Sequence, residues 1–275
     1  MVRQARLEKL NDFFSPLSAR REKGVFFCRI AGCSDEVTAF LLRYFDAARR
    51  TGVIIDGRIP NPTPDNLAYF TEMMGTEFRR DAAFLSEKLR RWLPRMSQQQ
   101  RDAVAAAMDS TFQDLLRSGK NENMLRNAYT KYMCWLYYRF ERIVNRLGAE
   151  EPPKILYDGT VSQYELLLLT VLSRAGADIV LLEREGDGGY AALDPQSTWS
   201  QCYQAGVLGQ FPPDFGVKWL QTRLAQEADR QRLYGTPPSV RGCTNAWMHE
   251  ASLGQVLTGA QARGGERDVF YNCFI

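Results

Sequence analysis

The stretch KILYDGT at residues 154–160 decides the fold class, because it reads as a short buried strand that ends in a polar loop. After it, the sequence predicts a helix from Ser162 to Arg174, a stop at Gly176 and a second strand from Ala177 to Leu182. This order is a β-α-β unit, in which the two strands run parallel and the loop after the first strand lies at the carboxyl edge of the sheet. Ligands of open α/β proteins bind at that edge.

A similar pattern lies nearer the amino terminus. Val25 to Ile30 reads as a strand, Ser34 or Asp35 as the cap of a helix, and Gly52 as its stop before a strand at Val53 to Ile55. We interpret this likeness as weak evidence for two related units, because β-α-β is a common pattern.

Between the two units the pattern changes to helices only. We expect them over residues 65–74, 81–92, 98–117 and 122–147, with a capping-box spacing at Ser97 and Gln100. The last helix is rich in aromatic residues, which favours the centre of a helical layer over an aromatic ligand platform. An arginine-rich face over residues 79–101 could bind RNA or an acidic protein, but the acidic residues between the arginines favour a solvated face.

These elements predict an α/β fold of Rossmann-like parallel β-α-β units with a helical subdomain inserted between them. We expect a lead-in helix and the first unit in residues 1–62, the helical subdomain in residues 63–150, and the second unit with following helices in residues 151–275. These following helices are expected at residues 217–233 and 250–262. The apolar end at residues 268–275 reads as a strand, which suggests a chain cut at Ile275 or a strand that closes the sheet.

Composition excludes several classes of protein. The formal net charge of +3 gives no whole-molecule field for nucleic acid, and no apolar run is long enough to cross a bilayer. The six cysteines form no CxxC pair, so we expect free thiols and a cytoplasmic protein. The single histidine, His249, excludes zinc sites that need several histidines, and we expect no metal site.

Asp158, Gly159 and Thr160 form the candidate ligand loop, because they lie between a strand and the start of a helix. Asp158 would repel a bare phosphate, so the loop suits a ribose, another hydroxyl-rich ligand or a metal-bridged phosphate. Gln163 could donate to the ligand from the first helical turn, and Glu183 ends the next strand, where an acid often binds a ribose. No GxGxxG and no P-loop motif is present, so the sequence shows neither a dinucleotide fingerprint nor a P-loop and leaves the cofactor unknown.

Three further features of the sequence have two readings each. Ser162 and Glu165 have the spacing of a capping box, which favours a structural role over ligand contact. Arg29 interrupts an apolar strand and needs an anionic partner, either a ligand or an internal carboxylate, of which Asp56 is nearest in sequence. The acidic loop that begins at Asp187 has the pattern of a solvated turn, which is favoured over a role as a lid or metal contact.

Several of these stretches resemble the YceG-like family: FFCRIAG at residues 26–32, ILYDG at residues 155–159, and LSRAGADIV at residues 172–180. That family is described as a component of a biosynthetic module encoded with tellurium-resistance proteins of the TerD, TerC and TelA types. The resemblance implies a bacterial stress-response protein, associated with tellurite resistance, that handles a nucleoside-like metabolite. It brings no catalytic residues with it.

Two hypotheses follow. In the first, the chain binds or processes a nucleotide-like or sugar-like metabolite at the carboxyl edge, through Asp158, Gly159, Thr160, Gln163 and Glu183, with Arg29 and Asp56 close by. In the second, the chain is a non-enzymatic scaffold whose helical region binds a TelA-like partner.

Overall fold

The computed structural model describes residues 2–60, 71, 78–204 and 206–234. The chain divides into two compact units, residues 1–220 and 221–275, and the sheet and the helical layer belong to the first. The expected helices at residues 65–74 and 250–262 and the expected strand at residues 268–275 lie outside the described residues, apart from residue 71. No helix in the described part of the chain combines the length and apolar character that a membrane crossing needs.

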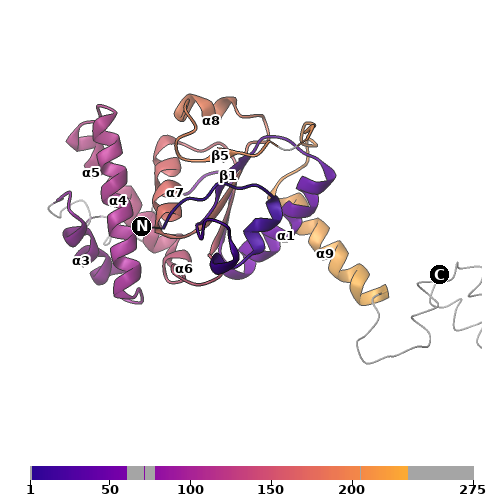
Figure 1. The fold of residues 1–275 in the computed structure, drawn as a ribbon, viewed down its shortest axis with the longest axis horizontal. Coiled ribbons are helices and arrows are strands. Elements are labelled where there is room, and N and C mark those ends of the chain that lie inside the picture. The colour runs from indigo at the N-terminus through magenta and orange to yellow at the C-terminus, as the bar shows by residue number, and fades with distance from the viewer. Residues whose placement is uncertain (1, 61–70, 72–77, 205, 235–275) are drawn as a thin grey trace, which may run out of the picture. The chain divides into compact units, whose positions relative to one another are not determined.

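Five parallel strands form one sheet in the order β2-β3-β4-β1-β5 (Figure 1). The strands are β1 (Phe27–Ile30), β2 (Val53–Asp56), β3 (Lys154–Asp158), β4 (Asp178–Leu182) and β5 (Gln201–Cys202). Strands β3 and β4 are neighbours joined through helix α7 (Gln163–Ala175), as the central β-α-β pattern predicts. The parallel α/β architecture is therefore confirmed.

The first unit is not a copy of the central one. Its strands β1 and β2 are separated in the sheet by β3 and β4, whereas the sequence likeness predicted two equivalent units. Burial agrees with these positions: every residue of β1 is buried in its inner place between β4 and β5. Strand β2 has only one buried residue, Ile55, and takes an edge.

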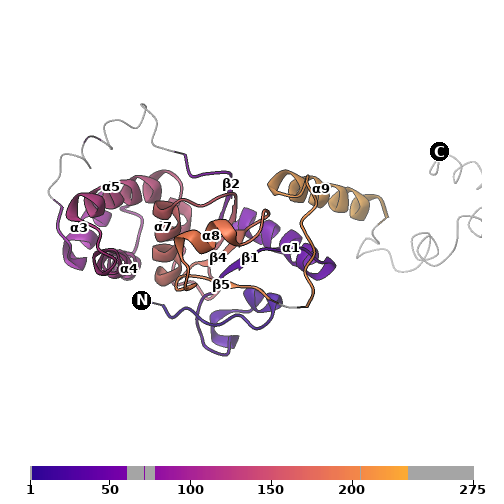
Figure 2. The same cartoon turned by 90° about the horizontal axis from the view of Figure 1, so that it is seen from above.

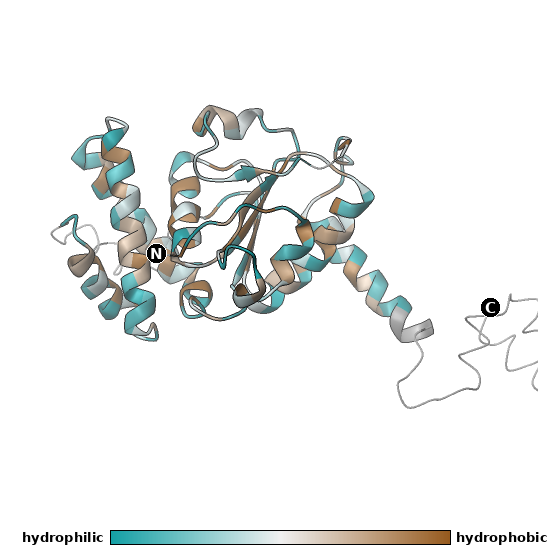
Figure 3. Ribbon diagram, viewed as in Figure 1, coloured by the Kyte–Doolittle hydropathy of each residue, from teal (hydrophilic) through white to brown (hydrophobic). Residues whose placement is uncertain are grey.

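Helices cover both faces of the sheet (Figures 1 and 2). Alternate side chains of β3 and β4, such as Ile155 and Ile179, join a core shared with α7 and the helical layer beyond it. Helix α1 (Asp35–Thr51), capped by Ser34, covers the other face and packs against β2 and β3. Brown colouring in Figure 3 follows the sheet and the inner helix surfaces, whereas helix α9 (Val217–Tyr234) is largely teal.

The helical layer consists of α3 (Ala82–Trp92), α4 (Gln98–Arg117), α5 (Glu122–Tyr138) and α6 (Glu141–Val144). The predicted capping box at the start of α4 is confirmed. The prediction of a single helix over residues 122–147 is wrong, because the helical structure is interrupted between α5 and α6 at Arg139 and Phe140. Tyr129, Tyr132 and Trp135 are buried, so α5 is a core helix, as predicted.

The prediction of a lead-in helix is also wrong. Residues 10–19 form two short 3-10 helices, η1 (Leu10–Phe14) and η2 (Leu17–Ala19), because Pro16 interrupts any longer helix. Phe13 buries its ring against Phe26, Phe40 and Tyr44. The apolar spacing therefore indicated burial correctly but not helical structure.

The cysteines that the structure describes are free thiols, as predicted. Cys28 and Cys134 are buried, and Cys33 and Cys202 are half-buried.

Candidate functional site

The carboxyl edge of the sheet holds a cavity of about 210 Å³ where β3 and β4 end. Gly159 and Thr160, from the loop after β3, line one side of it. Glu183, which directly follows β4, lines the other side together with the glycines at positions 186, 188 and 189. The structure therefore brings three of the predicted site residues to one cavity.

Glu183 is the buried acid of this cavity. Glu183 is 8% exposed. Its Oε1 atom has no hydrogen-bond partner in the described part of the chain. Its backbone N–H donates to the carbonyl of Ile30 at 3.0 Å, which fixes it beside the end of β1. Burial, with a smaller contribution from the Asp187 carboxylate, raises the pKa of Glu183 to about 7, while Arg29 acts in the opposite direction. Such a group can both accept and donate a proton near neutral pH.

Arg29 lies beside this acid but is bound within the chain. It donates to Asp187 at 2.6 and 3.0 Å and to the carbonyl of Ser200 at 2.7 Å, and its guanidinium lies 4.2 Å from the ring centroid of Tyr190. Its partner is therefore Asp187. The alternative, Asp56, was the nearest acid in sequence, but it ends β2, which lies three strands and roughly 14 Å away across the sheet.

Asp187 is not part of a solvated turn. It precedes a short helix, α8 (Gly188–Leu193), and its ion pair with Arg29 holds this segment on the sheet edge. Tyr190 is fully buried, and its hydroxyl donates to Asp194 at 3.0 Å. The loop that carries Glu183 therefore has fixed ends, which restricts the position of its carboxyl group.

Asp158 is buried and fully engaged by the chain itself. Its carboxylate accepts from Arg184 Nε at 2.7 Å and from the backbone N–H of Val217 at 3.0 Å. Burial raises the pKa of Asp158, while Val217 and Arg184 act in the opposite direction. A Cβ on Gly216 would lie 2.8 Å from the Asp158 carboxylate, so only a glycine fits beside it. Asp158 thus anchors the first turn of α9.

Gly159 lets two loops touch. It has φ +147°, and a Cβ there would lie 2.3 Å from the carbonyl oxygen of Gly57, in the loop after β2. Glu165 completes the contact, because its carboxylate accepts from the backbone N–H groups of Ile59 at 2.7 Å and Ser162 at 2.8 Å. The capping-box prediction for Ser162 and Glu165 is confirmed.

Thr160 and Gln163 remain accessible to a ligand. Thr160 is exposed at the cavity wall, and Gln163 is half-buried as the first residue of α7. Asp56 is exposed at the end of β2, in register with Asp158, and does not line the cavity. Among the described residues, no three His, Cys, Asp or Glu side chains converge as a metal site requires.

Sequence reasoning missed Arg184, which is the ionic partner of Asp158. One signal was available: Arg184 follows Glu183 directly at the end of a buried strand, at the same edge as Asp158. Ser197 and Ser200 were also missed, although both contact Arg29. No local pattern marks these serines, because only the fold brings them to β1.

The comparison with known families places the whole sheet in one domain. The YceG domain matches residues 7–228, which include Arg29, Asp158 and Glu183. The chain belongs to the YceG domain family. The matched range of this YceG domain runs from the lead-in segment, through the sheet and the helical layer, into α9. None of the curated proteins and none of the solved structures matches the chain.

Proposed function

We propose that this YceG domain binds a hydroxyl-rich metabolite, of the nucleoside or sugar kind, at the carboxyl edge, and that a hydrogen bond between a ligand hydroxyl and Glu183 changes the protonation of that carboxyl group. The observation behind this proposal is the Glu183 carboxyl group: it is buried, it has an oxygen without a described partner, and it lines a cavity. An unpaired buried polar atom is costly, and a ligand hydroxyl would satisfy it.

The cavity supports a neutral, polar ligand. Its volume of about 210 Å³ suits a sugar ring or part of a nucleoside rather than a complete dinucleotide. Thr160 supplies a hydroxyl group at the cavity wall, and Gln163 is accessible as the first residue of α7 but does not line the cavity. A bare phosphate fits less well, because two acidic residues, Glu183 and Glu185, line the cavity with one basic residue, Arg184, which is already paired with Asp158. No phosphate-binding motif is present either.

The same proposal includes a Rossmann-like binding mode, in which the ligand lies beyond the carboxyl ends of the parallel strands. The stress-response and tellurite-resistance setting, with TerD-, TerC- or TelA-like partners, stays a prediction from the family resemblance.

The test is a calorimetric titration of the full chain at pH 7 with unphosphorylated nucleosides and sugars, repeated in buffers of different ionisation enthalpy. Wild-type protein is expected to exchange a proton with solvent on binding a member of this panel, because a ligand on Glu183 shifts a pKa near 7. Glu183→Gln should abolish that proton exchange. Glu87→Gln is the matched control, since Glu87 is exposed on α3 away from the cavity. Binding with the same proton exchange in Glu183→Gln would contradict the proposal.

The scaffold hypothesis has no comparable observation in its favour. The aromatic side chains of α5 that a partner was expected to contact, including Tyr132 and Trp135, are buried in the chain's own core. The exposed arginines of α3 remain a surface that the hypothesis could use.

A further inference from the structure

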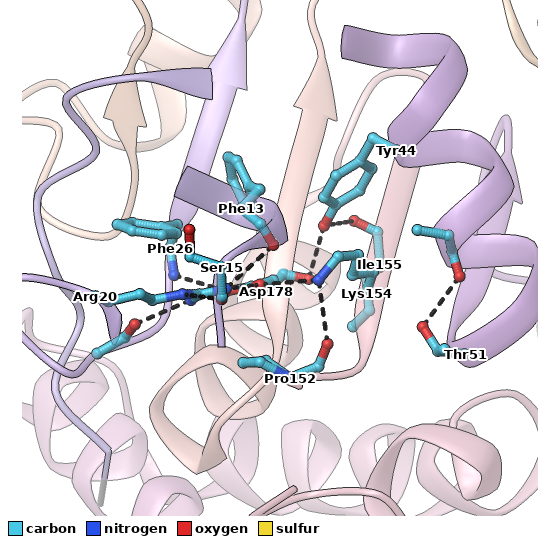
Figure 4. A network of polar contacts seen from close by, with 12 residues as sticks. Phe13, Ser15, Arg20, Phe26, Tyr44, Thr51, Pro152, Lys154, Ile155 and Asp178 are labelled. Atoms are coloured by element: carbon cyan, nitrogen blue, oxygen red, sulfur yellow. Dashed lines mark hydrogen bonds and ion pairs between the residues drawn. The ribbon is translucent and has the colours of Figure 1, made fainter. Parts of the chain in front are cut away.

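Among the described residues, the amino edge of the sheet, opposite the Glu183 cavity, holds two buried basic side chains, Arg20 and Lys154, and one buried acid, Asp178 (Figure 4). Arg20 donates to both oxygens of Asp178, at 2.8 and 2.7 Å, and this bidentate pair already balances the carboxylate. The ammonium group of Lys154 lies 3.3 Å from the same carboxylate, and the Lys154 side chain is 8% exposed. A buried cation in excess favours the arrival of an anion.

The pKa of Lys154 reflects the same opposing effects of burial and neighbouring charges. Burial lowers the pKa of Lys154, and the neighbouring Arg20 charge lowers it further, while Asp178 and Glu151 oppose both effects. Asp178 accepts from both cations but carries one negative charge for two positive ones, and its contacts with Arg20 are the shorter ones. The ammonium group of Lys154 also donates to the carbonyl of Pro152 at 3.4 Å, which adds no charge. A second anion beside Lys154 would stabilise its ammonium form.

A cavity of about 340 Å³ borders this lysine. Three cationic side chains line it, Lys154, Arg43 and Arg50, against one acidic side chain, Glu151. Arg43 stacks on Phe14, with 3.8 Å between the guanidinium carbon and the ring centroid, and forms no ion pair with a described residue. The wall therefore combines excess positive charge with an aromatic face.

Arg50 adds to the excess charge. It shares the carboxylate of Asp46 with Arg49, so two guanidinium groups have one counter-charge between them. Only Arg50 of the two lines the cavity.

We propose that this cavity binds a small oxyanion, a phosphate or carboxylate, attached to an apolar body. The oxyanion contacts Lys154 and Arg50, which supply charge-assisted hydrogen bonds. The apolar body lies against the apolar part of the lining, which includes Ala47, Pro152 and the part of Phe14 that Arg43 leaves uncovered. This site is separate from the Glu183 cavity. Lys154 begins β3 and Asp158 ends it, so the two sites lie at opposite ends of one strand, roughly 13 Å apart.

The probe is phenyl phosphate, which carries both parts of the proposed ligand, with phenol as the probe that lacks the oxyanion. Calorimetric titration of the full chain at constant ionic strength is expected to show saturable binding of phenyl phosphate and none of phenol. Lys154→Met should remove the saturable binding. A wild-type chain that gives no saturable heat with phenyl phosphate would overturn the proposal.

Arg50→Gln and Arg49→Gln form a matched pair. The two residues are adjacent on α1, share the partner Asp46 and have side chains 67% and 63% exposed, so neither substitution should disturb folding. Arg50→Gln is expected to weaken phenyl phosphate binding roughly tenfold, the loss of one charge-assisted hydrogen bond. Arg49→Gln should weaken it by less than about twofold, because it changes only a screened surface charge. Equal weakening by both variants would show a general electrostatic attraction instead of a binding site and would overturn the proposal. The comparison of Arg50→Gln with Arg49→Gln remains a test even if Lys154→Met does not fold.

Discussion

At the scale of single residues, Glu183 should make the stability of the chain depend on pH. Its pKa rises from 4.5 to about 7 on folding, so between these values the folded chain holds a proton that the unfolded chain has lost. The free energy of unfolding therefore falls as the pH rises through this window, by about 3 kcal/mol in total for this one group.

Glu183→Gln removes that titration. The difference in unfolding free energy between Glu183→Gln and wild type should move in favour of the variant by about 3 kcal/mol from pH 4 to pH 8. Urea unfolding at several pH values measures it, and Glu87→Gln should show a constant difference from wild type. A parallel pH profile for Glu183→Gln and wild type would refute the buried, proton-binding state of Glu183.

The sequence predicted that Arg29 needs an anionic partner, but it did not predict which residue is that partner. A guanidinium in an apolar strand needs an anion, and the structure supplies one. The partner, Asp187, lies far away in the sequence, in a loop with several glycines that reads as a solvated turn. Sequence distance favoured Asp56, and only the strand order excludes it.

At the scale of elements, Asp158 fastens the first turn of α9, at Val217, to the end of β3. Asp158→Ala removes the acceptor of both Arg184 and the Val217 N–H, and should lower the free energy of unfolding by about 3 kcal/mol. Asp158→Asn keeps an acceptor for Val217 but turns an amide NH2 group toward Arg184, so it loses the charge and the hydrogen bond from Arg184 together. Because the bond to Val217 remains, this variant should lose less than the alanine variant, about 1–2 kcal/mol.

Urea unfolding of the two Asp158 variants separates the contribution of the Val217 hydrogen bond from that of the ion pair with Arg184. Equal losses in the alanine and asparagine variants would mean that the ion pair alone holds the first turn of α9. These variants also affect any ligand assay at this edge, so their binding must be measured below the unfolding transition.

Elements with capping signals were predicted well from the sequence. Helices α1, α4 and α7 begin after Ser34, Ser97 and Ser162, each of which accepts a hydrogen bond from its first turn. The lead-in segment has no such signal, and its apolar spacing suits 3-10 helices as well as an α-helix. The break after α5 has no glycine or proline at Arg139 or Phe140, so local sequence could not show it.

At the scale of the whole molecule, the helical layer and the sheet share one apolar core. Leu89 of α3 and Ile179 of β4 belong to the same cluster of buried residues. Leu89→Ala and Ile179→Ala should therefore each destabilise one cooperative transition, by about 2–4 kcal/mol. Hydrogen exchange measures this: the amides of α4 and β3 should lose protection together in both variants. Loss of protection in α4 alone, in Leu89→Ala, would show an independently stable helical subdomain.

The strand order could not be predicted. The sequence indicates which segments are strands, but neighbours in a parallel sheet are chosen by burial and by the helices on each face. The carboxyl edge was predictable because it follows from parallel strands in any order. The particular cavity at Glu183 was not, since it depends on which loops meet there.

The position of β1 also affects how the chain folds while it is being synthesised. Its partner in β4 lies about 150 residues downstream, since Phe27 pairs with Ile179, and its other neighbour, β5, follows later still. A ribosome that adds 5–20 residues per second needs roughly 8–30 s to supply that partner. Throughout this time an apolar strand leaves the exit tunnel with both edges unpaired, so the nascent chain is expected to depend on chaperones until β4 emerges.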